Sequence, residues 1–124
     1  MAALDSSALI HILSGTKQGN EIKEQFGYEA ASITAISINE VLIGVHEKNK
    51  EEVLRFLQGF DILPFDARAA IKSVELERTL AKSGKPIGKL DLFIAAICIV
   101  HDVHLITTDK DFNNIKDLKV MLIP

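Results

Sequence analysis

Short apolar runs alternate along this chain with longer segments of helical periodicity. Five runs have the length and the aliphatic or β-branched content of buried strands. They are residues 2–4, 31–35, 62–65, 104–107 and 120–123. Because parallel strands need a crossover between them, the alternation predicts a mainly parallel sheet of about five strands with helices on both faces. The expected fold is a three-layer α/β/α, Rossmann-like sandwich.

The segments between these runs differ in how their apolar residues are spaced. Residues 92–100 are apolar on every side, which predicts a buried helix. In the helix expected after Asp66, one stripe has helical spacing: Ala67, Ala70, Ile71, Val74 and Ala81. This stripe is predicted to face the core, with Asp66 as the N-cap. Leu76 and Leu80 lie off the stripe and are interpreted either as secondary core or as part of a dimer surface.

Composition limits the class of protein. The chain has 124 residues, 48% of them hydrophobic and 25% charged, which is typical of a single globular domain over 1–124 and excludes a disordered tail. The lone Cys98 excludes an intramolecular disulfide, so a cytoplasmic location is expected. No run is long enough to cross a membrane, and no signal peptide is apparent. A net charge of −3 argues at first against a nucleic-acid binder.

Four acidic residues come where the chain leaves a predicted strand or enters a helix. Asp5 follows the first strand, Glu40 is expected in the first helical turn after the second, Asp91 opens the buried helix, and Asp109 follows the fourth strand. The carboxyl ends of parallel strands share one edge of the sheet, where such folds bind ligands. The sequence therefore predicts that these carboxylates meet.

Each acid also has a purely structural interpretation. Asp5 and Asp91 suit the start of a helix, where a carboxylate caps the backbone or favours the helix dipole. Glu40 has capping-box spacing from Ser37, and Asp109 is a common turn residue. The placement of all four acids together favours a cation-binding site, since clustered carboxylates need protons or a cation to stay together.

The types of ligand select the metal and the chemistry. Carboxylates without His or Cys favour Mg²⁺ or Mn²⁺ over zinc. Such an ion suits hydrolysis of a phosphodiester, in which one ion activates water and a second, about 3.5–4 Å away, stabilises the leaving oxygen. One or two ions are thus expected.

Four segments around these acids resemble the PIN domain family, and within it the VapC-like ribonuclease toxins. They occur in family order and span most of the chain: 4–10 (LDSSALI), 33–44 (ITAISINEVLIG), 86–96 (PIGKLDLFIAA) and 105–112 (LITTDKDF). The resemblance implies a Mg²⁺- or Mn²⁺-dependent endoribonuclease that leaves 5′-phosphate and 3′-hydroxyl ends. By position, Asp5, Glu40, Asp91 and Asp109 match the acidic centre.

The same resemblance implies supporting residues and partners. Asp111 matches an additional metal-binding acid, and Ser7 and Thr107 match hydroxyls that support the site. Leu90 departs from the family pattern, where Asn is common, and Lys89 often corresponds to a less basic residue. The family members usually form homodimers and are inhibited by a small antitoxin, whose C-terminal segment enters the acidic groove.

The net charge of the chain changes sign when the four acids of the predicted site are left out. Without the four acids, 13 acidic residues stand against 14 basic ones, a net charge of +1 for the rest. Bound cations make the site itself attractive to phosphate. Candidate contacts to RNA phosphates are the lysines near Asp91 and Asp109, namely Lys82, Lys85, Lys89 and Lys110; each can equally be a solvated surface residue.

Two other functions remain open at this stage. One is a PIN-fold protein that binds RNA or a protein partner without cutting. The other is a phosphoacceptor receiver module, which has a similar length and a parallel sheet. That module needs an acidic pair after strand 1 and a Lys after strand 5, and this chain has neither.

Overall fold

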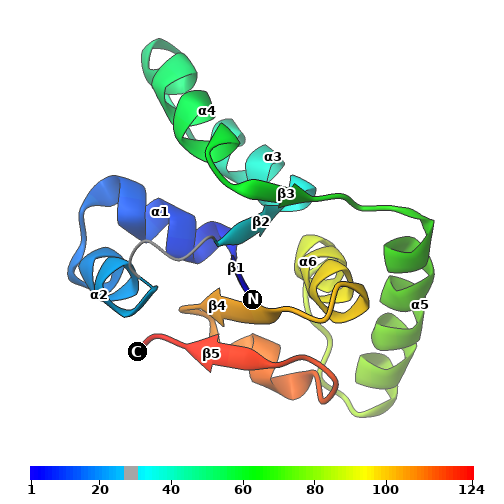
Figure 1. Cartoon of the computed structure of the whole chain (residues 1–124). Helices are drawn as coiled ribbons and strands as arrows, with labels where there is room; N and C mark the ends of the chain where they lie inside the picture. The colour runs from blue at the N-terminus through cyan, green and yellow to red at the C-terminus, as the bar shows by residue number, and fades with distance from the viewer. Residues whose placement is uncertain (27–30) are drawn as a thin grey trace.

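The chain folds around a parallel sheet of five strands. The structure is a computed structural model that describes residues 1–26 and 31–124. The strands are β1 (Ala2–Leu4), β2 (Ser32–Thr34), β3 (Asp61–Leu63), β4 (His104–Thr107) and β5 (Val120–Leu122). Their order across the sheet is β3-β2-β1-β4-β5, and every pairing is parallel (Figure 1). This confirms the predicted sheet, with strand ends within one or two residues of expectation.

The strand order also separates two of the candidate folds. A Rossmann sheet has the order 3-2-1-4-5, whereas receiver modules have the order 2-1-3-4-5. The observed order matches the first and contradicts the receiver-like alternative. Since β1 and β4 are neighbours from which the chain leaves in opposite directions, the ligand-binding switch point lies at their carboxyl ends.

Helices connect the strands and cover both faces of the sheet. They are α1 (Ser6–Ser14), α2 (Lys17–Phe26), α3 (Ala35–Ile43), α4 (Lys50–Gln58), α5 (Ala67–Lys82) and α6 (Lys89–Val100), with short 3₁₀ turns η1 (Glu47–Asn49) and η2 (Lys110–Asn114). Connections that run from β1 toward β3 use α1 to α4, whereas the return to β4 uses α5 and α6. Crossovers between parallel strands are right-handed. The helices of connections that run in opposite directions along the sheet therefore lie on opposite faces of it.

Two hydrophobic cores correspond to these two faces. Ala3 and Leu105 point into a core built mainly from α5, α6 and the segment after η2. Leu4 and Ile106 point into the other core, with buried side chains from α1 to α4. Neighbouring strand residues alternate between the cores because successive side chains point to opposite faces of a sheet. The three-layer sandwich is thereby confirmed.

Helix α6 is buried as predicted, because Leu92 and residues 94–98 are almost inaccessible to solvent. The stripe predicted for α5 is wrong. Ile71 is 66% exposed and Val74 is 45% exposed, while the core contacts come from Ala69, Ser73, Leu76 and Leu80.

The α5 sequence carries two apolar stripes, and packing against α6 and the segment after η2 selects the one with leucines. The secondary-core interpretation of Leu76 and Leu80 is therefore confirmed. Among the described residues, no helix is both long and apolar enough to cross a membrane.

Candidate acidic site at the strand ends

Asp5 lies at the junction between β1 and α1 and is the most buried of the predicted acids, with 3% exposure. Its Oδ1 accepts hydrogen bonds from the Ser7 hydroxyl at 2.7 Å and from the Ala8 amide at 2.9 Å. Its Oδ2 accepts one from the Thr107 hydroxyl at 2.5 Å. Burial raises the pKa of Asp5, although these three hydrogen bonds oppose the shift. Oδ2 still has one lone pair for a further ligand.

The end of β4 supplies the second strand-end acid. The Asp109 amide donates to the Thr107 hydroxyl at 2.9 Å, and Asp109 Oδ1 accepts from the Asp111 amide at 2.9 Å. The Thr108 amide donates to the Ser7 hydroxyl at 3.3 Å. Ser7 and Thr107 therefore tie the β1 junction to the β4 junction, and their role in supporting a metal site stays a prediction.

Glu40 projects from α3 and is half-buried. It lies in the second turn, not the first, because Thr34 is the N-cap and accepts from the Ser37 amide at 3.1 Å. The capping box between Ser37 and Glu40 is thus wrong. Instead, Glu40 Oε1 accepts a hydrogen bond from the Ser6 hydroxyl at 2.5 Å.

Ser6 was not predicted from the sequence. Its only sequence signal is its place beside Ser7 at the start of a helix. The contact joins residues 34 positions apart, so only the packing of α1 against α3 reveals it.

Asp91 is in the first turn of α6, whose N-cap Gly88 makes no side-chain capping bond. Burial raises the pKa of Asp91 to about 6. Nearby negative charges add to this shift, in decreasing order those of Glu40, Asp109, Asp5 and Asp111. Asp91 therefore lies within electrostatic reach of the other four predicted acids.

The donor set fits a hard cation, although the side chains do not yet enclose one. Within residues 1–26 and 31–124, no three side chains of His, Cys, Asp or Glu converge closely enough to hold an ion as they stand. Carboxylates alone suit Mg²⁺ or Mn²⁺, and a cation would remove the repulsion that raises the pKa of Asp91.

Two of the predicted acids also have a structural role. Asp5 is the N-cap of α1, and Asp109 is the N-cap of η2. A cap uses only part of a carboxylate's hydrogen-bonding capacity, so both residues can cap a helix and bind a ligand.

The four candidate lysines differ in their surroundings. Lys82, Lys85 and Lys110 are exposed. Lys89 is also exposed, but its Nζ forms an ion pair with Glu77 of α5 at 2.9 Å. A phosphate contact by Lys89 would compete with this pair, so Lys89 is the weakest of the four predictions.

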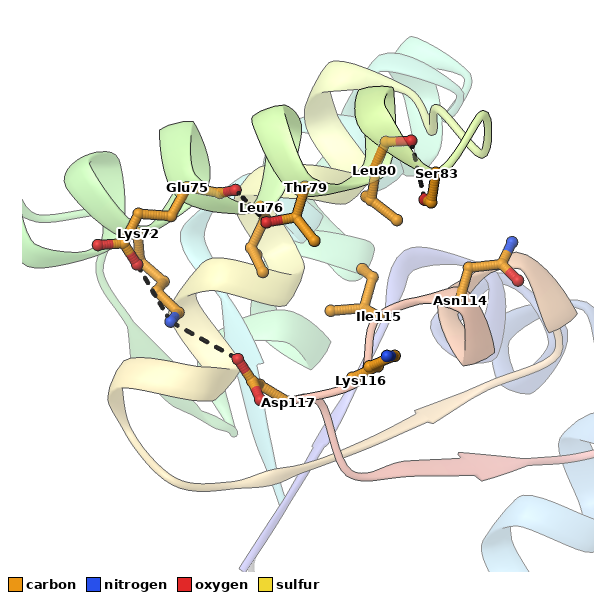
Figure 2. Close-up of a pocket in the computed structure, with 10 residues that line it drawn as sticks. All are labelled: Lys72, Glu75, Leu76, Thr79, Leu80, Ser83, Asn114, Ile115, Lys116 and Asp117. Atoms are coloured by element: carbon orange, nitrogen blue, oxygen red, sulfur yellow. Dashed lines mark hydrogen bonds and ion pairs between the residues drawn. The ribbon is translucent and has the colours of Figure 1, made fainter.

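A pocket of about 310 Å³ lies between α5 and residues 114–117, and none of the predicted site residues lines it. Leu76, Leu80 and Ile115 form its apolar wall (Figure 2). At one end, Lys72 pairs with Glu75 at 3.2 Å and with Asp117 at 3.9 Å. These three charges therefore balance one another in part at that end of the pocket, away from the acidic edge.

Comparison with known proteins places this chain in a family. The PIN domain matches residues 2–118. Ribonuclease VapC1 of Rickettsia felis is 33% identical, in an alignment that covers 97% of this chain and 94% of the relative.

Two solved structures share the fold. VapBC2 from Rickettsia felis, bound to a DNA fragment from its promoter, has a TM-score of 0.85 and 22% identity, covering 99% of this chain and 98% of the other. A toxin–antitoxin complex from Klebsiella pneumoniae has a TM-score of 0.83 and 26% identity, covering 100% of this chain and 98% of the other. The PIN domain covers nearly the whole chain, and a VapC relative is 33% identical to it. The chain therefore belongs to the PIN domain family and is of the VapC type.

Proposed function

We propose that this protein is a divalent-metal-dependent endoribonuclease, the toxin of a toxin–antitoxin pair. The observation that carries the proposal is that four other acids, Asp5, Glu40, Asp109 and Asp111, lie near enough to Asp91 to raise its pKa. Relatives named ribonuclease VapC support the choice of RNA as substrate.

Asp5, Glu40, Asp91 and Asp109 would hold one or two Mg²⁺ or Mn²⁺ ions, with Asp111 as an additional ligand. Such an ion, when bound, stabilises negative charge on the phosphate and makes water easier to deprotonate. Ser7 and Thr107 orient Asp5 by donating to its two oxygens. One lone pair of Oδ2 is then available for a ligand.

The test is cleavage of structured RNA in the presence of Mn²⁺ or Mg²⁺. We expect EDTA to abolish cleavage and Asp5→Asn to reduce it about a hundredfold or more. Asp102→Asn is the matched control, because Asp102 is an exposed acid paired with Lys119 at 3.0 Å, outside the cluster. Cleavage that survives both EDTA and Asp5→Asn would contradict the mechanism.

A protein that binds RNA without cutting is the second candidate. The observation that favours it is the lack of three converged ligands in the described residues. RNA binding that persists in EDTA, with no cleavage at any Mn²⁺ concentration, would establish this alternative.

Phosphate contacts by Lys82, Lys85 and Lys110 belong to the same proposal. Replacing each with Ala should raise KM about three- to tenfold and leave kcat nearly unchanged, since a rim charge contributes mainly to binding. Lys89→Ala should have a smaller effect, because its charge is already paired with Glu77. An equal rise in KM for all four variants would contradict the smaller effect predicted for Lys89→Ala.

The proposed partners are a second copy of this chain and a small antitoxin, in a cytoplasmic setting. Solved relatives that are described as VapBC complexes support the antitoxin. Co-purification with the product of a neighbouring small gene, together with loss of RNA cleavage in the complex, is the expected result. Full cleavage activity in such a complex would contradict the inhibitory role.

A further inference from the structure

Two consecutive serines open α1, and each donates its hydroxyl hydrogen to a different acid. Ser7 donates to Asp5 Oδ1 at 2.7 Å, within the same turn. Ser6 donates to Glu40 Oε1 at 2.5 Å, across to α3. Successive helical residues point about 100° apart, so one helix start can contact both sides of the cluster.

Glu40 needs such a contact more than the other acids do. Its side chain has three rotatable bonds, projects from the second turn of α3 and is only half-buried. The negative charges of Glu40 and Asp91 repel each other, which favours rotation of Glu40 toward solvent. Among the described residues, Ser6 provides the only hydrogen bond to this carboxylate.

The contact also restricts how Glu40 can bind a ligand. Ser6 occupies one lone pair of Oε1, which leaves Oε2 as the less encumbered oxygen. Hydrogen bonds from outside the ligand set orient metal-binding carboxylates, and removing one weakens metal affinity about 10- to 100-fold.

We propose that Ser6 is a positioning residue that holds the Glu40 carboxylate in the acidic cluster for divalent-metal binding. The inference rests on the proposed function, because it assumes that the cluster binds a cation. Ser6 itself touches neither substrate nor metal in this scheme and acts only through Glu40.

The test compares Ser6→Thr with Ser6→Val. The two side chains have nearly the same shape and both are β-branched, so they differ mainly in the hydroxyl. Ser14→Ala, at the exposed end of the same helix, is the control for loss of a hydroxyl elsewhere. Mn²⁺ affinity is measured by electron paramagnetic resonance on the metal-free protein, and carboxyl ¹³C resonances are recorded before metal addition.

We expect Ser6→Thr and Ser14→Ala to bind Mn²⁺ like the unmodified protein and Ser6→Val to bind it about tenfold more weakly. The carboxyl resonance of Glu40 should move in Ser6→Val, while that of Asp5 stays in place. RNA cleavage by Ser6→Val should recover at Mn²⁺ concentrations that saturate the weakened site.

Two results would overturn the inference. One is equal Mn²⁺ affinity of Ser6→Val and Ser6→Thr, whether both are unchanged or both are weakened. The other is a shift of the Asp5 resonance in place of that of Glu40. If the unmodified protein binds Mn²⁺ and cleaves RNA in these cases, the proposed function stands without the role of Ser6. If the unmodified protein does not bind Mn²⁺, both proposals fail together.

Discussion

The two halves of the acidic cluster are held in very different ways. The strand-end pair, Asp5 and Asp109, is fixed by backbone amides and by the Ser7 and Thr107 hydroxyls. The helix pair, Glu40 and Asp91, is half-buried. Among the described residues, the one hydrogen bond to the carboxylates of this pair comes from Ser6.

The difference shows how one site combines rigidity with adjustment. Strand ends are fixed by the sheet and can preorganise a carboxylate at little further cost, as binding sites require. Side chains on helices retain rotamers through which they can close around a ligand or relieve repulsion. The strand-end pair should therefore govern stability, and the helix pair should govern the response to pH and to cations.

The largest expected effect comes from breaking the strand-end pair with Thr107→Val. Thr107 is fully buried, and Val keeps its shape but loses the bond to Asp5 and the acceptor for the Asp109 amide. Leaving these groups without partners should lower the free energy of unfolding by about 2–3 kcal/mol in urea titrations. Thr107→Ser keeps the hydroxyl and should lose only about 1 kcal/mol; a Ser variant no more stable than the Val variant would contradict this.

A smaller effect, of opposite sign, is expected from Asp91→Asn in the helix pair. An acid whose pKa is raised to about 6 binds its proton more tightly in the folded state than in the unfolded one. It therefore lowers stability as pH rises from about 4 through 6, with the full cost present above pH 6. Asp91→Asn should stabilise the metal-free protein at pH 7.5 by about 1 kcal/mol, after allowance for solvent screening.

Thermal unfolding at several pH values in EDTA measures this effect, and the gain should shrink toward pH 4. Asp102→Asn is a control that should change the free energy of unfolding in the opposite direction. The hydrogen bond from Lys119 lowers the pKa of Asp102, so the charge of Asp102 stabilises the folded state. Asn also tolerates the left-handed backbone of residue 102, where φ is 52°. A pH-independent gain in Asp91→Asn would show that its charge is not the cause.

The smallest expected effect concerns the coupling inside the helix pair. Glu40→Gln removes the charge that contributes most to the repulsion of Asp91, but burial remains the main cause of the raised pKa. The pKa of Asp91, followed by ¹³C NMR titration, should fall by less than about one unit. Glu51→Gln on the exposed surface of α4 is the control and should leave it unchanged, whereas a fall to the ordinary value would make repulsion the dominant cause.

Much of the fold was predictable because its signals are local. The alternation of short apolar runs with helical segments was enough to predict five parallel strands and helices on both faces. Residues 92–100 are apolar on every side, so their burial in α6 did not depend on knowing what surrounds them. The position of the strand-end acids, Asp5 and Asp109, could be predicted in the same way, since parallel strands all end at one edge of the sheet.

The tertiary structure decided what local patterns leave open. Ile71 and Val74 have the spacing of a core stripe, yet α5 buries Leu76 and Leu80, because contact with α6 and the segment after η2 selects the face. The hydrogen bonds of Ser6 to Glu40 and of Thr107 to Asp5 join residues 34 and 102 positions apart. Periodicity reports only on neighbours along the chain, whereas such contacts depend on how separate elements pack. The sequence thus determined which carboxylates reach the edge of the sheet, and packing decided how firmly each one is held there.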